Sequence, residues 1–96
     1  MLSIVVLISG TGSNLKALLE ACDNPLYPAK VLAVGADRAA EGLEHAELFD
    51  KTTFVVQPES FASKDEWEKV LASNIDIHQP DLIVLAGFMR VLPKSF

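Results

Sequence analysis

The sequence predicts an α/β protein with a Rossmann-like parallel sheet. Four short apolar runs, rich in Val, Ile and Leu, alternate with stretches in which apolar residues recur at helical spacing. The first and last runs are continuously apolar, as expected for strands that are covered on both faces. The resulting order is β-α-β-α-β-α-β, and right-handed crossovers between successive strands make such a sheet parallel.

The four apolar runs are the expected strands, and they cover Ile4–Ile8, Val31–Ala36, Thr53–Val56 and Leu82–Ala86. If the first three strands wind outward and the fourth returns beside the first, the strand order is 3-2-1-4. That order reverses between the first and fourth strands, and ligands of open α/β sheets bind at such a switch point. A binding site is therefore expected where these two strands end.

Three helices are expected between the strands, each from apolar residues at helical spacing. The apolar positions of the first are Leu15, Leu18, Leu19 and Cys22, and it ends near Asn24-Pro25. Those of the second, shorter helix are Leu43, Ala46 and Phe49. In the third, Trp67, Val70, Leu71, Asn74 and Ile75 follow a 3.6-residue period. Ser63 to Glu66 has the pattern of a capping box, in which Ser63 accepts from the N3 amide and Glu66 reaches back.

The length of 96 residues allows one domain at most. The chain ends at Phe96, a few residues after the fourth strand, with no helix to cover that strand. We therefore expect residues 1–96 to be an incomplete domain, truncated after the fourth strand. An open strand edge can pair with another chain, so self-association through the fourth strand is also expected.

Composition excludes several classes of protein. With 13 acidic and 8 scattered basic residues, the chain lacks the clustered basic face of a nucleic-acid-binding protein. No apolar stretch approaches the ~20 residues that span a bilayer, so no membrane contact is expected. The single cysteine, Cys22, has no partner for a disulfide or a CxxC metal site, and we expect it to be a small buried residue. These features favour a cytoplasmic protein without a bound metal.

The loop after the first strand, SGTGSNL, has the features of a phosphate site. Gly10 and Gly12 allow the backbone to approach an anion closely, and Thr11, Ser13 and Asn14 add side-chain donors. The amides of the first helical turn and the helix dipole would favour negative charge there. The alternative is an ordinary strand-to-helix turn in which Ser13 or Asn14 only caps the helix.

The type of phosphate ligand is narrowed by what the loop lacks. No lysine follows the second glycine, so the loop is not a P-loop, and Leu15 replaces the third glycine of the dinucleotide fingerprint. Asp37 lies at a suitable distance to bind a ribose, although a solvated loop acid that caps the next helix is the favoured interpretation. Donors grouped around one glycine suit a phosphate monoester, while a non-catalytic nucleotide-binding module of Rossmann type stays open.

A second unusual stretch, LAGFMRVLP (Leu85–Pro93), lies at the carboxyl end of the fourth strand. Because the first and fourth strands are expected to be neighbours, Gly12 to Asn14 and Gly87 to Leu92 are expected to flank one cleft. Together, VVLISGTGSNL (Val5–Leu15) and PDLIVLAGFMRVL (Pro80–Leu92) closely resemble the N-terminal half of the folate-dependent phosphoribosylglycinamide formyltransferases. The resemblance runs over the whole chain. It implies formyl transfer from 10-formyltetrahydrofolate to the primary amine of glycinamide ribonucleotide, a step of purine biosynthesis.

The resemblance also implies roles for individual residues. The positions that match the family's 5′-phosphate loop are Gly12, Ser13 and Asn14, and Gly87 lies on the substrate side of the cleft. The positions that match the pterin-binding segment are Met89, Arg90, Val91 and Leu92. Lys64 stands at a folate-site position where the family usually has arginine, which keeps the charge but loses the bidentate fork.

The family's catalytic residues, an Asn-x-His pair and a later aspartate, lie beyond this segment by the same resemblance. No catalytic residue is therefore expected in this chain, and the chain alone is expected to be inactive. His45 and His78 are interpreted as helix-surface residues, and Trp67 as packing between helix and sheet. A formyltetrahydrofolate hydrolase shares the fold and remains an alternative, although its need for a phosphate loop is smaller.

Overall fold

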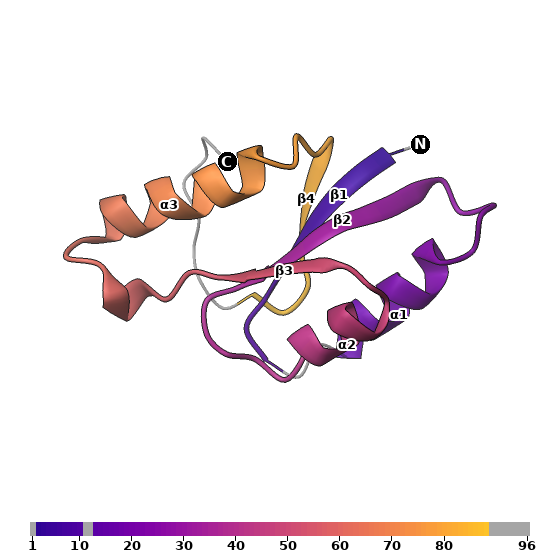
Figure 1. Ribbon diagram of the computed structural model, residues 1–96, viewed down its shortest axis with the longest axis horizontal. Coiled ribbons are helices and arrows are strands. Elements are labelled where there is room, and N and C mark those ends of the chain that lie inside the picture. Colours follow the sequence, from indigo (N-terminus) through magenta and orange to yellow (C-terminus); the bar gives the residue numbers. More distant parts are fainter. Residues whose placement is uncertain (1, 11–12, 89–96) are drawn as a thin grey trace.

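The computed structural model describes residues 2–10 and 13–88, with Ser13 described for its backbone only. The elements are β1 (Leu2–Ile8), α1 (Ser13–Cys22), β2 (Ala29–Ala36), α2 (Leu43–Leu48), β3 (Thr52–Val55), the 3₁₀ turn η1 (Pro58–Ser60), α3 (Lys64–Asp76) and β4 (Leu82–Leu85). The strands form one parallel sheet in the order β3-β2-β1-β4 (Figure 1). The predicted fold class and strand order are thus confirmed.

Strand β1 lies inside the sheet and pairs on both sides. Its partners run from Leu2↔Ala29 to Ile8↔Ala36 on β2, and from Ile4↔Leu82 to Leu7↔Leu85 on β4. Residues 4–8 are buried. This burial explains why the run is continuously apolar, because neither face of the strand meets water.

Helices cover both faces of the sheet, α1 and α2 on one and α3 on the other (Figure 1). Successive side chains of β1 point to opposite faces of the sheet, so they are divided between the two helical layers. Ile4, Val6 and Ile8 belong to the core under α1 and α2, whereas Val5 and Leu7 pack with Trp67, Leu71 and Ile75 of α3. The sheet and its helices thus form three layers with two separate apolar cores.

A β-bulge interrupts the alternation of β2. Ile4 pairs with Val31 but Val5 pairs with Ala33, so Leu32 is an extra residue on this strand. As a result Val31 and Val34, three positions apart, both join the core under α1 and α2. The sequence does not reveal the bulge. In a run of apolar residues, either alternate set of side chains can face either buried layer.

The element boundaries follow the expected local chemistry. Strand ends differ from the predicted ones by one or two residues, and η1 was not predicted. The Oγ of Ser63 accepts from the Glu66 amide at 3.2 Å, so the predicted N-cap of α3 is confirmed. The second helix is short, as expected, and it ends at Leu48 with Phe49 as its C-cap.

Gly35 is required by a close approach between neighbouring strands. A Cβ built on it would overlap the far end of the Phe54 ring and would lie 3.0 Å from Leu7 Cδ2. The Phe54 ring is itself stacked against His78. The ring therefore has little freedom to move away from an added methyl group.

We predict that Gly35→Ala lowers the free energy of unfolding by about 1–3 kcal/mol, because the added methyl group overpacks this contact. Gly10→Ala is the matched control, since the space around Gly10 is open, and it should change stability by less than about 1 kcal/mol. Adding Phe54→Leu to Gly35→Ala should recover part of the loss. Urea unfolding measures all of these variants, and equal stability of the two alanine variants would refute the proposed overlap.

Candidate functional site

The carboxyl ends of β1 and β4 meet at one edge of the sheet. Leu7 pairs with Leu85, and the Ala86 amide donates to the Leu7 carbonyl at 2.9 Å. Gly10 and Gly87 follow these strand ends by a few residues each and are both exposed. The reversal of strand order thus brings together two segments that are far apart in the sequence.

The loop after β1 leads into α1 at this edge. Around Gly10 the space is open, and Asn14, in the first turn of α1, is exposed. No acidic residue occupies the first turn of this helix, so no carboxylate of that turn neutralises the partial positive charge at the helix N-terminus. The Gly42 amide donates to the Gly10 carbonyl at 3.1 Å and ties the start of α2 to the loop. Of the other predicted phosphate-binding residues, Gly12 and the Ser13 side chain lie outside the described residues.

Gly87 makes the turn that follows β4. Its φ of +79° lies in the left-handed region, which favours glycine, and a Cβ built there would meet no atom within 4 Å. A side chain would therefore strain the backbone although space is available. The predicted pterin-binding residues come next in the chain, but Met89, Arg90, Val91 and Leu92 lie outside the described residues.

Lys64 is the first residue of α3. A helix that connects parallel strands runs antiparallel to them, so its first residue lies toward the carboxyl ends of the strands. The Lys64 Nζ is 3.8 Å from Glu68 Oε2, one helical turn further along, and its side chain is largely exposed. The Nζ–Oε2 distance is long and the lysine end of the pair is exposed, so the pair is weak and the ammonium group can exchange Glu68 for another anion.

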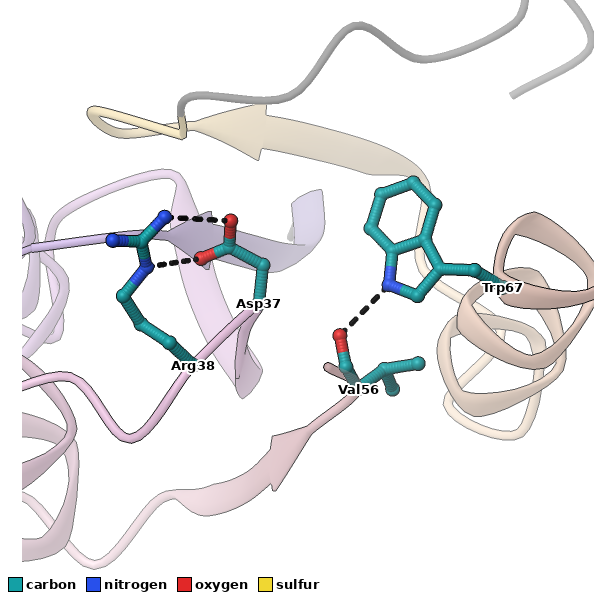
Figure 2. Close-up of polar contacts among 4 residues, drawn as sticks. All are labelled: Asp37, Arg38, Val56 and Trp67. Carbon is teal, nitrogen blue, oxygen red and sulfur yellow. Dashed lines mark hydrogen bonds and ion pairs between the residues drawn. The ribbon is translucent and has the colours of Figure 1, made fainter. Parts of the chain in front are cut away.

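Asp37 corrects one expectation. It is 1% exposed, not solvated, and it does not cap α2, whose N-cap is Gly42 without a side-chain hydrogen bond. The half-exposed Arg38 donates from Nε to Asp37 Oδ1 at 3.3 Å and from Nη2 to Oδ2 at 3.4 Å (Figure 2). This pair balances the charge of the buried carboxylate. Its position directly after a largely buried strand was a signal for burial that the sequence offered.

His78 corrects a second expectation. It lies in the turn after α3, not on the surface of the helix, and its half-buried ring stacks on Phe54 with centroids 6.3 Å apart. His45 lies within α2, as expected, and is also half-buried. Neither contributes to a cluster of metal ligands, since the described part of the chain contains no group of three or more His, Cys, Asp or Glu residues that could hold a metal ion.

Trp67 packs α3 on the sheet, as predicted. It is 2% exposed, and its Nε1 donates to the Val56 carbonyl at 2.8 Å (Figure 2). Its ring also stacks on Phe88, with centroids 6.4 Å apart and an angle of 7° between the planes. Sequence reasoning did not find these two partners, because Val56 and Phe88 lie 11 and 21 positions away along the chain.

A hollow of about 400 Å³ lies beside the end of β3. Its lining comprises Ala39, Val55, Val56, Gln57, Ser60, Phe61, Val70 and Asn74. None of the predicted site residues contributes to it. Within residues 2–10 and 13–88, no helix has the length and apolar character needed to cross a membrane.

Comparisons with known proteins agree with this arrangement. The family model described as Formyl transferase matches residues 2–96. The chain belongs to the formyl transferase family. A phosphoribosylglycinamide formyltransferase of Escherichia coli (strain K12) is 42% identical over 96 residues, which cover 99% of this chain and 45% of that protein. This formyl transferase chain thus spans just under half the length of that relative and of the Mycobacterium tuberculosis protein of the same name.

Two solved structures show the same fold. The phosphoribosylglycinamide formyltransferase of Brucella melitensis superposes with a TM-score of 0.92 at 42% identity, over 95% of this chain and 48% of that one. The enzyme of the same name from Coxiella burnetii, in complex with CHES, gives 0.91 at 45% identity, over 98% and 44%. The sheet order of this formyl transferase chain is therefore that of its relatives.

Cys22 provides a test of local electrostatics in this formyl transferase chain. Burial raises the pKa of the Cys22 thiol above its ordinary value, and the positive charge of Lys51 opposes that shift. Alkylation by iodoacetamide should therefore be slow at neutral pH and should rise at a higher pH than for free cysteine. Lys51→Gln should move the midpoint higher still, while Lys69→Gln, on α3, should not. A midpoint at or below that of free cysteine would contradict the assignment.

Proposed function

We propose that residues 1–96 are the N-terminal, phosphate-binding half of a phosphoribosylglycinamide formyltransferase. The whole protein would transfer a formyl group from 10-formyltetrahydrofolate to the primary amine of glycinamide ribonucleotide in purine biosynthesis. The observation that carries this proposal is the pairing of β1 with β4, which brings the strand ends that precede Gly10 and Gly87 to one edge of the sheet. Relatives of this name, 42% and 43% identical over nearly the whole chain, support it.

The start of α1 is suited to the ribonucleotide 5′-phosphate. A phosphate monoester carries up to two negative charges, and the first-turn amides and the dipole of a ten-residue helix attract them. The open space at Gly10 lets an anion approach the backbone, and the exposed Asn14 amide adds a donor. With Gly12 and Ser13, these groups would bind the phosphate without a net positive surface.

The folate would lie on the β4 side of the same edge. In this proposal Gly87 faces the ribonucleotide, and Met89, Arg90, Val91 and Leu92 contact the pterin of 10-formyltetrahydrofolate. Lys64 would attract an anionic group of the folate by charge alone, because an ammonium group lacks the two-pronged geometry of the usual arginine. Its weak pairing with Glu68 leaves that charge accessible.

The proposed reaction moves a formyl carbon between two nitrogens. The substrate amine attacks the formyl carbon, an oxyanion forms, the bond to N10 of the folate breaks, and the amine loses a proton while N10 gains one. An Asn-x-His pair and an aspartate, expected beyond residue 96, would stabilise the oxyanion and transfer the proton. The 96-residue chain alone should therefore not catalyse formyl transfer.

The alternative of a dinucleotide-binding module is weakened by Asp37. A dinucleotide site needs an acid after the second strand that is free to bind a ribose. Here the Asp37 side chain is buried and engaged by Arg38. A formyltetrahydrofolate hydrolase has less use for the phosphate loop, and replacement of Asn14 distinguishes it from the proposed transferase.

Asn14→Ala in the full-length protein should raise the KM for glycinamide ribonucleotide about tenfold, the effect of losing about one charge-assisted hydrogen bond. The KM for 10-formyltetrahydrofolate should stay within about twofold. Asn24→Ala is the matched control, because it removes the same side chain beyond the opposite end of α1, where Asn24 Oδ1 accepts from the Leu26 amide. Steady-state assays of formyl transfer measure both constants.

Three results would contradict the proposal. Hydrolysis of the formyl donor without transfer to the ribonucleotide would favour the hydrolase. Equal KM values for glycinamide ribonucleotide in the Asn14 and Asn24 variants would show that the phosphate is not bound at the start of α1. Formyl transfer by the 96-residue chain alone would overturn the assignment of catalysis to later residues.

A further inference from the structure

Trp67 connects three parts of the chain that meet near the candidate site. Its Nε1–H bond to the Val56 carbonyl fixes the indole to the chain that leaves β3. In a second contact, the ring of Phe88 stacks on the indole, with an angle of 7° between the planes. Because the indole is held at both the nitrogen and the ring face, its orientation is determined more tightly than that of an aliphatic core residue.

The partner of Trp67 belongs to the turn after β4. Gly87 has a left-handed φ of +79°, and Phe88 follows it directly and packs with the core under α3. On the other side of the turn, the Ala86 amide is bonded to Leu7. The Gly87 turn is therefore attached to β1 through the Ala86 amide and to α3 through the stacking of Phe88 on Trp67.

We propose that Trp67 is a positioning residue for the folate side of the site, acting through Phe88. This rests on the proposed function, in which the residues directly after Phe88 bind the pterin. Without the indole, Phe88 loses its stacking partner and the turn loses this attachment to α3. The turn at Gly87 and Phe88 would then sample several positions, and the folate would have to order it on binding.

The inference distinguishes Trp67 from an ordinary core residue. Leu71 lies one turn further along α3, in the same apolar core, and is equally buried. Replacing either residue lowers stability, but only Trp67 has a stacking contact with the turn. Leu71→Val is therefore the matched control for a loss of packing.

The test compares Trp67→Leu, Trp67→Phe and Leu71→Val in the full-length protein. Trp67→Leu should raise the KM for 10-formyltetrahydrofolate about tenfold or more, since small displacements of a positioning group have effects of this size. Its KM for glycinamide ribonucleotide should stay within about twofold, as should both constants of Leu71→Val. Trp67→Phe keeps a ring for Phe88 and should be intermediate. An unchanged folate KM in Trp67→Leu, or an equal rise in Leu71→Val, would overturn the inference.

A second measurement needs no substrate and separates this inference from the proposed function. Amide hydrogen exchange in peptides covering residues 84–88 should accelerate in Trp67→Leu and not in Leu71→Val. The chain contains a single tryptophan, so Phe88→Leu should also change the intrinsic fluorescence spectrum of the native protein. If wild-type protein transfers no formyl group but exchange still responds as expected, the proposed function fails while the link between Trp67 and the turn stands. Unchanged exchange in Trp67→Leu would refute that link.

Discussion

The parallel pairing of β1 with both β2 and β4 is the constraint on which the rest of the structure depends. It buries the backbone and both faces of β1, which is why residues 4–8 are apolar without interruption. It also reverses the strand order at β1, so that the chain leaving β1 and the chain leaving β4 share one edge. The strand ends that precede the candidate binding residues are neighbours for this reason.

The two helical layers support this edge in different ways. On one face, α1 starts at the edge and presents its amides and dipole, and the Gly42–Gly10 hydrogen bond ties α2 to the same loop. On the other face, Trp67 links α3 to the chain after β3 and to the turn after β4. The phosphate side of the proposed site thus depends on backbone groups, whereas the folate side depends on side-chain packing.

The sequence predicted those features that a local pattern determines. Continuous apolar runs predicted the four strands, and the Ser63 cap predicted the start of α3. The bulge at Leu32 was not predicted, because an extra residue does not disturb the pattern of a strand that is buried on both faces. The burial of Asp37 was missed for a different reason: an unpaired acid is costly to bury, and the sequence does not show that the side chain of the adjacent Arg38 folds back onto this carboxylate.

In the proposed function, the β1/β4 edge holds the ribonucleotide phosphate and the folate side by side. A crystal structure of the full-length protein with glycinamide ribonucleotide and an unreactive folate analogue tests it most directly. We predict that the phosphate lies at the start of α1 beside Asn14, and that the pterin lies against the chain that follows Phe88. A phosphate bound elsewhere, for example in the hollow beside Phe61 at the end of β3, would contradict the account.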